Sequence, residues 1–302
     1  MTGPVASTAA PVRPTRAACR GCGETLHHVF VDLGQSPIAN DFLRADQLHA
    51  QERVYPLRVY VCEHCLLVQL EEFATPDAIF NAEYAYFSSF SESWVRHARD
   101  YAEMMVRHFQ LNGSHRVIEV GSNDGYLLQW FRQKGIPVLG IEPSVNTARV
   151  AVDKGIPCIT RFFGLQLAEE LLAQERGADL LIGNNVLAHV PNILDFVAGM
   201  KRLLKPSAIA TVEFPHFLNL FRHNQFDTIY HEHFSYLSLL AVQRIFSDNG
   251  LTIFDVEELP THGGSLRLFA RHAGRAGPPV TARVEDVLAE ERTAGVNRVE
   301  TY

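Results

Sequence analysis

The sequence predicts an α/β protein with a seven-stranded, mainly parallel sheet, preceded by a small metal-binding domain. Two observations carry this prediction. After Asn112-Gly113, short apolar runs alternate with stretches of helical period, which is typical of strands joined by crossover helices. Before residue 75, two C-x-x-C pairs occur, which is typical of a metal site. A chain of 302 residues is long enough for one large domain and one small one.

The alternation places the elements of the large domain in chain order. We expect helices to begin after the polar or glycine-rich turns and to end at Lys205-Pro206 and Gly250, because proline and glycine terminate helices. The predicted strands lie near residues 116–120, 138–142, 157–160, 179–183, 208–213, 251–256 and 266–270. The predicted helices lie near residues 125–134, 144–154, 164–175, 192–204 and 236–248.

The composition excludes several classes of protein. With 47% hydrophobic and 20% charged residues, the chain resembles ordinary soluble proteins. Its formal net charge of −7 argues against a nucleic-acid partner, because phosphate binding favours clustered Lys and Arg. No apolar run approaches the roughly 18–20 residues that span a bilayer, so no membrane interaction is expected. Residues 1–18 lack the apolar segment of a signal peptide, so we expect a disordered tail, a cytoplasmic location and reduced thiols.

Four cysteines in two pairs predict a structural zinc site. Zinc favours four tetrahedral thiolates, and each C-x-x-C turn presents two of them to one ion. The alternatives are a redox pair or two unrelated pairs, but a redox motif normally occurs once. Four thiolates fill the shell without His64, so the metal should fold the domain rather than catalyse a reaction. Cys158 is expected in the core. The predicted ligands are Cys19, Cys22, Cys62 and Cys65.

A glycine-rich loop follows the first strand of the large domain, in the stretch VIEVGSNDG from Val117 to Gly125. Gly121 and Gly125 allow the backbone to approach a ligand, and the next helix offers its positive end. The stretch does not fit the dinucleotide fingerprint G-x-G-x-x-G. It resembles the first motif of class I methyltransferases, E/D-x-G-x-x-x-G, which in that Rossmann-like fold wraps S-adenosylmethionine. The resemblance makes Glu119, Asn123 and Asp124 cofactor-site candidates as well.

Other strand ends supply further candidates for the cofactor site. Glu142, followed by Pro143, ends the second strand, where an acid accepts hydrogen bonds from both ribose hydroxyls. Asn184 and Asn185 follow the fourth strand, at the edge where ligands collect in open sheets. Phe162 is a candidate to pack on adenine, with a core aromatic residue as the equal alternative.

Three stretches hold candidate catalytic residues. They are the tyrosine-rich stretch at 84–89, His189 after the fourth strand, and Tyr230-His231-Glu232-His233 after the fifth. Adjacent titratable groups near a cofactor pocket are a source of acid–base chemistry. The alternative is a solvated polar loop. We favour a catalytic role because the last stretch lies between the fifth strand and the next helix, which in this fold faces the methyl group.

Several motifs together resemble the sugar C-methyltransferases that make branched deoxysugars for antibiotics. They are the two C-x-x-C pairs, VIEVGSNDG, LLIGNNVLAHV, VEFPHF, QFDTIYHEHFSYLS and EELPTHGGSLRLFARH. The resemblance implies a dTDP-linked 4-keto deoxysugar as substrate, methylated at a carbon beside the ketone. It places five residues in the active site, with His233 as the base: Tyr84, His189, Tyr230, Glu232 and His233. Family members usually continue into a further α/β domain, so we expect this chain to lack that C-terminal domain and to have weakened binding of the nucleotide-sugar.

The chemistry of methylation independently fits this interpretation. A sugar carbon attacks a sulfonium methyl only as an enolate, which requires a base and a donor to the oxyanion. His233 supplies the base; Glu232 orients it or binds a hydroxyl; Tyr230 or Tyr84 donates to the oxygen. Two alternatives stay open: an O- or N-methyltransferase acting on another small molecule, and a zinc-ribbon binding protein with a degenerate methyltransferase domain.

These interpretations divide the chain into five parts. The aromatic, helical stretch between the two domains is predicted to connect them and to act as a substrate lid. The parts are a tail at 1–18, a zinc-binding domain at 19–75, the connector at 76–112, the S-adenosylmethionine-binding domain at 113–273, and a linker with a charged helical piece at 274–302 that has no core of its own.

Overall fold

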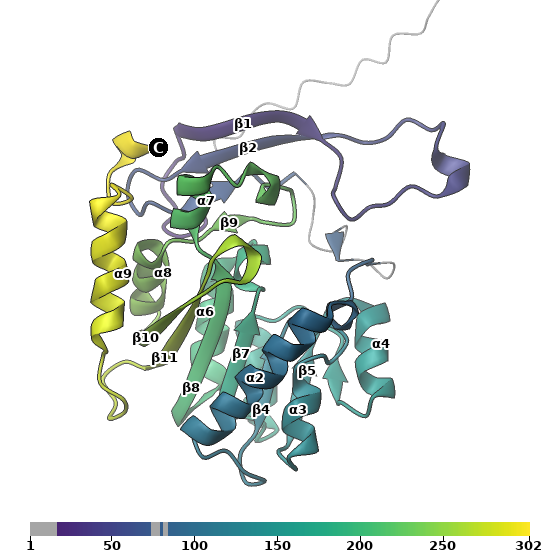
Figure 1. The fold of residues 1–302 in the computed structure, drawn as a ribbon, viewed down its shortest axis with the longest axis vertical. Helices are drawn as coiled ribbons and strands as arrows, with labels where there is room; N and C mark the ends of the chain where they lie inside the picture. The colour runs from purple at the N-terminus through teal and green to yellow at the C-terminus, as the bar shows by residue number, and fades with distance from the viewer. Residues whose placement is uncertain (1–16, 74–78, 81–83) are drawn as a thin grey trace, which may run out of the picture.

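The computed structural model describes residues 17–73, 79–80 and 84–302, which form two sheets (Figure 1). Residues 1–16 of the predicted tail lie outside the described residues. Ala18 is already part of the small domain, because it forms a β-bridge with Thr25. In the part of the chain that the structure describes, no helix has the length and apolar character that crossing a membrane requires.

The small sheet contains four antiparallel strands in the order β1-β2-β3-β9. Three come from the cysteine-rich segment: β1 (His28–Ser36), β2 (Tyr55–Val61) and β3 (Val68–Leu70). The fourth, β9 (Ser235–Tyr236), comes from the stretch that directly follows His233. The candidate catalytic stretch is therefore part of the small sheet as well as of the large domain.

The large sheet has seven strands in the order β10-β11-β8-β7-β4-β5-β6. Five neighbouring strands are parallel. At one edge β11 pairs antiparallel with β8, and β10 pairs antiparallel with β11, so β10 again runs in the direction of the five. The strand order reverses direction beside β4, which is where open α/β sheets bind ligands. The strands are β4 (Val117–Val120), β5 (Val138–Ile141), β6 (Cys158–Ile159), β7 (Ala178–Asn184), β8 (Leu204–Pro215), β10 (Leu251–Leu259) and β11 (Ser265–His272).

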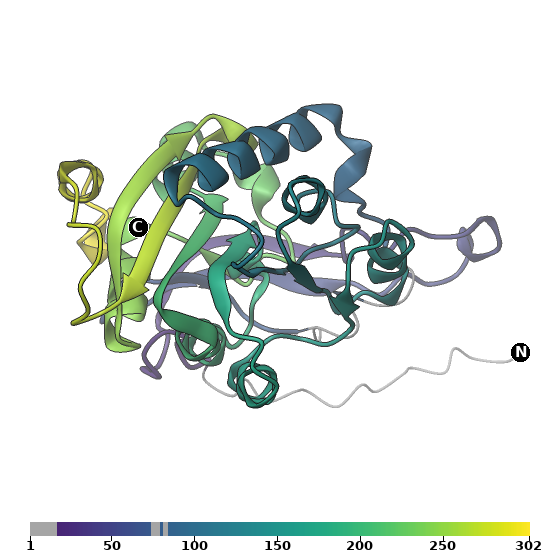
Figure 2. The ribbon, with the colours of Figure 1, turned by 90° about the horizontal axis from the view of Figure 1, so that it is seen from below.

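Helices cover both faces of this sheet (Figure 2). The apolar side chains of α2 (Glu92–His108) and α3 (Leu128–Gln133) form one core layer. Those of the helices on the opposite face form the other, namely α5 (Leu165–Ala173), α6 (Ile193–Leu203), α8 (Leu239–Asp248) and α9 (Ala282–Thr293). Two further helices are α4 (Val145–Asp153), which overlaps the helix predicted near residues 144–154, and the short α7 (Phe217–His223). The alternation pattern did not predict α7.

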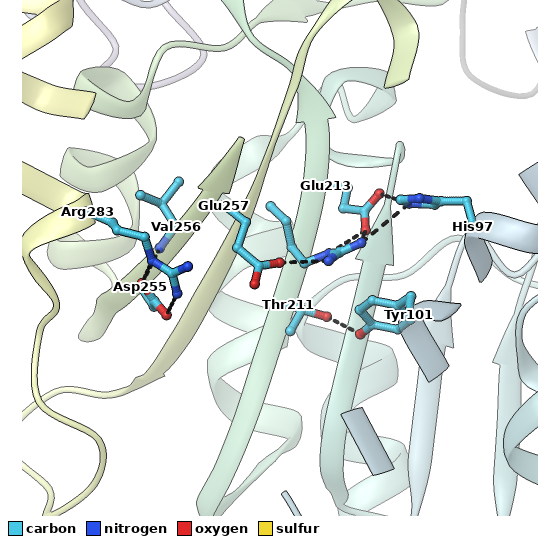
Figure 3. Close-up of polar contacts among 9 residues, drawn as sticks. His97, Tyr101, Thr211, Glu213, Asp255, Val256, Glu257 and Arg283 are labelled. Carbon is cyan, nitrogen blue, oxygen red and sulfur yellow. Dashed lines mark hydrogen bonds and ion pairs between the residues drawn. The ribbon is translucent and has the colours of Figure 1, made fainter. Parts of the chain in front are cut away.

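The charged C-terminal piece folds onto the large domain. Its helix α9 buries Val284, Val287 and Leu288 in the same core layer as α8. Arg283 at its start pairs with Asp255 of β10, with 2.9 Å between Nε and Oδ1 (Figure 3). The helix has no separate core, as predicted, because it shares the core of the domain before it.

A buried polar network fixes α2 to the sheet (Figure 3). Arg267 of β11 lies between Glu213 of β8 and Glu257 of β10, with nitrogen–oxygen distances of 2.6 and 2.7 Å. His97 of α2 lies 2.9 Å from the other Glu213 oxygen. Burial opposes ionisation of Glu213, but His97 and Arg267 hold its pKa below the ordinary value. The network therefore anchors the connector helix over the sheet.

Candidate active site and metal centre

The four predicted metal ligands lie together, with all sulfur atoms within 4.8 Å of one another. Sγ of Cys19 is 3.4 Å from that of Cys65, and Sγ of Cys22 is 3.5 Å from that of Cys62. These separations fit the edges of a tetrahedron around one ion with bonds of about 2.3 Å. Nε2 of buried Gln69 donates to Sγ of Cys19 at 3.1 Å, which suits a thiolate ligand.

His64 stays outside this cluster, as predicted from the complete sulfur set. Its ring and its carbonyl oxygen accept hydrogen bonds from Arg244 of α8, at 3.1 and 2.8 Å. The second C-x-x-C turn is thereby fastened to the large domain. Among the described residues, the donor set is four sulfurs with no oxygen or nitrogen, so the cluster fits structural zinc.

A cavity of about 810 Å³ opens at the carboxyl ends of the parallel strands. This volume falls within the range of small-molecule sites, about 300–1,000 Å³. Its walls come from the cofactor loop, the connector, the catalytic stretch and the small domain. The predicted residues that line it are Tyr84, Gly121, Asn123, Glu142, Pro143, Phe162, Asn184, Asn185, His189, Tyr230, Glu232 and His233.

The two loop glycines have different surroundings. Gly121 lines the cavity with φ of +69°, and a Cβ there would lie 3.1 Å from Val186. Gly125 is not among the residues that line the cavity. Its φ is +77°, and a Cβ would lie 2.4 Å from Cδ1 of Ile156. Close packing under the loop therefore requires glycine at this position.

Asn123 and Asp124 hold the connector against the cofactor loop. Oδ1 of Asn123 accepts the Ser88 N–H at 2.9 Å, and its Nδ2 donates to the Tyr86 carbonyl at 3.1 Å. Asp124 accepts from Ser89 and lies 3.3 Å from Nζ of Lys154. Asp124 does not line the cavity, so its contacts are those of a scaffold residue.

Several polar groups at the strand ends fit a polar cofactor. Both polar side-chain atoms of Asn184, which lines the cavity, have no hydrogen-bond partner among the described residues. The two oxygens of Glu119 also have none, but this buried residue does not line the cavity. Burial and the carboxylates of Glu142 and Asp124 raise the pKa of Glu119. Because buried polar groups are normally satisfied, a donor and an acceptor on a bound molecule are expected at Asn184.

Glu142 stands at the position predicted to bind ribose. Its two oxygens accept the N–H groups of Asn123 and Ser144 at 2.9 and 2.8 Å, and each oxygen keeps a further lone pair. The neighbouring phenylalanines differ. Phe162 is 43% exposed and lines the cavity, whereas Phe163 packs on Phe196 with ring centroids 5.3 Å apart. Phe162 is therefore the residue of the pair whose ring is accessible to a molecule in the cavity.

Two imidazoles, those of His189 and His233, are neighbours in the cavity, with ring centroids 4.7 Å apart and planes tilted by 60°. Nδ1 of His233 lies 2.7 Å from the Thr228 carbonyl, and its Nε2 lies 3.0 Å from the Tyr230 hydroxyl. Nδ1 of His189 lies 3.0 Å from the Glu232 carbonyl. Burial lowers the pKa of His233 to about 4 and that of His189 to about 3. Both rings are therefore neutral near pH 7.

The Glu232 carboxylate makes its hydrogen bonds outside this imidazole pair. Its Oε1 accepts from Asn40 at 2.6 Å, and its Oε2 accepts from the Tyr84 hydroxyl at 3.3 Å. The Thr228 carbonyl contacts Nδ1 of His233, and no hydrogen bond joins the Glu232 carboxylate to either imidazole among the described residues. His231 is also outside the cavity, because its Nε2 contacts the Pro56 carbonyl at 3.1 Å.

Sequence reasoning did not single out many of the residues that line the cavity. Among them are Asn40, Phe80, Trp94 and His262. Trp94 and His262 meet edge to face at 5.0 Å, and Phe80 meets His189 in the same way at 5.9 Å. His262 belongs to the THGGSLR stretch, which was a usable signal. Asn40 follows a β-strand of the small domain, where nothing in the local sequence pattern marks it.

Three segments of the chain match known protein families. Residues 19–80 match a zinc binding domain, and residues 93–256 match a methyltransferase domain. Residues 260–302 match the C-methyltransferase C-terminal domain. The expectation that the chain lacks this C-terminal domain is therefore wrong. The matched segment includes β11 and α9, which pack on the preceding domain. For this reason the sequence pattern did not mark them as a separate domain.

Individual proteins are also similar to this chain. The C-methyltransferase NovU of Streptomyces niveus is 37% identical over 94% of the chain and 67% of its own length. The ubiquinone biosynthesis O-methyltransferase of Rhodopseudomonas palustris is 29% identical over 32% of the chain and 38% of its own length. A solved S-adenosylmethionine-dependent methyltransferase from Clostridium acetobutylicum has a TM-score of 0.49 and 11% identity, covering 60% of this chain and 92% of its own.

Proposed function

Since the chain belongs to the S-adenosylmethionine-dependent C-methyltransferases, we propose that it methylates a carbon beside the ketone of a dTDP-linked 4-keto deoxysugar. Its large domain has the class I methyltransferase fold, as predicted, and its cofactors are S-adenosylmethionine and structural zinc. The proposal concerns the acceptor and the residues that act on it.

The contact that carries the proposal is the hydrogen bond between His233 and Tyr230 in the cavity wall. When bound, S-adenosylmethionine supplies an electrophilic methyl group. An oxygen or nitrogen acceptor needs only to lose its own proton. A carbon beside a ketone must first become an enolate, which requires a base that reaches the carbon and a hydrogen-bond donor that reaches the neighbouring ketone oxygen. His233 and Tyr230 form such a pair.

The tautomer of His233 suits it to the role of base. Because the Thr228 carbonyl accepts from Nδ1–H, the lone pair of the neutral ring lies on Nε2. Burial lowers the pKa to about 4, so the ring is unprotonated when the substrate binds. The negative charge that develops on the enolate then stabilises the imidazolium beside it.

The single lone pair on Nε2 also determines what Tyr230 can do. In the ligand-free cavity, the Tyr230 hydroxyl donates to Nε2. This hydroxyl must turn away before Nε2 can take the proton from the carbon, and its hydrogen can then be donated to the enolate oxygen. This arrangement favours Tyr230 over Tyr84 as the oxyanion donor, because the Tyr84 hydroxyl is directed at Glu232. Glu232 is left with the second predicted role, accepting a hydrogen bond from a sugar hydroxyl.

The proposal is tested by incubating the protein with methyl-¹³C S-adenosylmethionine and a panel of dTDP-4-keto-6-deoxysugars. The expected product carries a labelled methyl whose carbon couples to a ring carbon in the NMR spectrum. A labelled methyl on oxygen or nitrogen would instead support the O- or N-methyltransferase alternative. Cofactor binding without any methylated sugar would reject this class of acceptor.

A further inference from the structure

We propose that Asn40 is a positioning residue that holds the Glu232 carboxylate in the cavity, which makes the metal-binding domain part of the active site. The inference rests on the proposed function, in which Glu232 binds a hydroxyl of the sugar. It adds a residue from outside the methyltransferase domain, with a role that the catalytic stretch cannot supply for itself.

The hydrogen bonds of Glu232 support this assignment. Its side chain is buried, with the residue 1% exposed, so the carboxylate depends on protein donors rather than on bulk water. Asn40 Nδ2 donates to Oε1 at 2.6 Å, while the Tyr84 hydroxyl donates to Oε2 at 3.3 Å. The Asn40 contact is the shorter one. Each oxygen of Glu232 therefore has its own side-chain donor, Asn40 for Oε1 and Tyr84 for Oε2. Hydrogen bonds to a charged group contribute more than those between neutral groups.

The chemistry of the side chain explains why asparagine is suited to this position. A carboxamide offers N–H donors to the carboxylate and keeps its own oxygen as an acceptor. Asn40 and Glu232 both line the cavity, so a hydroxyl-bearing ligand meets an acceptor on each. An aspartate at residue 40 would place a second carboxylate against Glu232 and repel it.

Three contacts tie the catalytic stretch to the small sheet and keep Asn40 in reach. His231 Nε2 lies 3.1 Å from the Pro56 carbonyl in β2. The Leu70 N–H of β3 donates to the Phe234 carbonyl at 3.0 Å, and β3 pairs with β9 directly after it. Since Cys62 follows β2 and Cys65 precedes β3, the metal-binding turn lies between the two strands that carry these contacts. The hydrogen bond from Asn40 to Glu232 adds a further contact between the small domain and the catalytic stretch.

The first test observes the contact without any substrate. The Glu232 carboxyl is followed by ¹³C NMR in protein labelled at glutamate Cδ, and its signal is assigned with Glu232→Gln. Tyr84 and Tyr230 are the titratable side chains near this carboxyl. Removing a donor to the charged form should raise the Glu232 pKa in Asn40→Ala. Asp41→Asn, an exposed neighbour, should leave it unchanged.

The second test measures steady-state kinetics with the sugar substrate. Asn40→Ala should lower kcat/KM for the sugar about 10- to 100-fold, mainly through a higher KM, with unchanged affinity for S-adenosylmethionine and unchanged zinc content. Asn40→Ser keeps a donor and should lose less, whereas Asn40→Asp should lose more. Asp41→Asn should match the wild type.

The outcomes separate this inference from the proposed function. If wild-type protein makes no C-methylated sugar, the proposed function fails, and the NMR titration alone decides the inference. An unchanged Glu232 titration in folded, zinc-loaded Asn40→Ala would overturn it. So would a raised pKa combined with a sugar KM equal to that of the wild type in an active enzyme.

Discussion

Nδ1 of His233 lies 2.7 Å from the backbone carbonyl oxygen of Thr228, and this contact leaves Nε2 as the nitrogen that can act as a base. The carbonyl belongs to the same loop as the histidine, five residues earlier. Loop conformation therefore sets the tautomer, and no second side chain is needed to do so. The predictions that follow concern this base, its pKa, the metal and the C-terminal helix.

Replacing His233 by asparagine should abolish most turnover and preserve cofactor binding. Asparagine retains a donor to Thr228 but has no basic nitrogen, and a positioned base is typically worth about 10²–10⁴-fold in rate. Methyl transfer is followed by mass spectrometry and cofactor affinity by calorimetry. His108→Asn, on the exposed end of α2, is the matched control and should behave as the wild type. Normal turnover in His233→Asn would remove the residue from its role.

The rate should stay constant well below the ordinary histidine pKa. A base acts only when neutral, and burial lowers the pKa of His233 from 6.5 to about 4. As the pH falls, kcat/KM should therefore begin to decline nearer pH 4 than pH 6.5, since this parameter reports the free enzyme. A pH–rate profile with the acid limb centred at 6.5 or above would contradict the prediction.

The same pKa makes the fold sensitive to acid. The unfolded chain takes up a proton at His233 near pH 6.5, whereas the folded protein does so only at about 4. The corresponding stability is complete above the unfolded value and is lost as the pH falls through the folded one. Urea unfolding measured across this range should show less acid destabilisation in His233→Asn than in the wild type. Equal acid destabilisation of the two proteins would contradict this.

One zinc ion per chain should be bound, and the small sheet should depend on it. Cys62→Ser removes one thiolate and should lose the metal, as measured by mass spectrometry of the metal content. Cys158→Ser alters a cysteine outside the cluster and should retain one zinc. Because β3 pairs with β9, chelation should also reduce methyl transfer. Full zinc occupancy in Cys62→Ser would contradict the assignment.

The C-terminal helix should be essential to stability through Glu291. This fully buried carboxylate contacts Nε2 of His216 at 2.7 Å and accepts the N–H groups of Leu239 and Leu240 at 2.6 and 2.8 Å. Glu291 thereby holds together the two ends of the segment that carries the catalytic stretch, because His216 precedes Tyr230 and Leu239 follows His233. Breaking a buried pair typically costs about 3–5 kcal/mol, so Glu291→Gln should lower the free energy of unfolding by roughly that amount.

The neighbouring residue provides the control for this prediction. Glu290 pairs with Arg222 on the surface, where each side chain is 40% exposed. Such pairs contribute about 0–1 kcal/mol, so Glu290→Gln should have little effect on urea unfolding. Equal losses in the two variants would show that the Glu291 contacts do not carry the stability.

The sequence was sufficient to predict the large sheet because its strands are buried and regularly separated by helices. All seven predicted strands overlap those of the structure, from β4 to β11. Elements too short to show a periodic pattern of apolar residues could not be predicted in this way. The strand β9 has two residues, and the helix α7 has seven, so neither extends over enough residues for a period to show.

The site was predictable where motifs lie at strand ends and not where distant segments meet. Glu142, His189 and His233 line one cavity, as their positions after parallel strands implied. Asn40 reaches Glu232 across 192 residues of sequence, a contact that depends on how the small sheet packs. A glycine after a strand serves close packing as readily as it serves a ligand, and the sequence around Gly125 does not distinguish the two.

Deuterium exchange at the carbon beside the ketone tests the central claim most directly. The sugar is incubated in deuterated water with wild-type protein and S-adenosylhomocysteine, which cannot donate a methyl group, and is then analysed by mass spectrometry. We predict that the wild type exchanges that proton and that His233→Asn does so at least about 100-fold more slowly. Methylation on carbon by a wild-type protein whose His233→Asn variant still exchanges the proton at the normal rate would contradict the account.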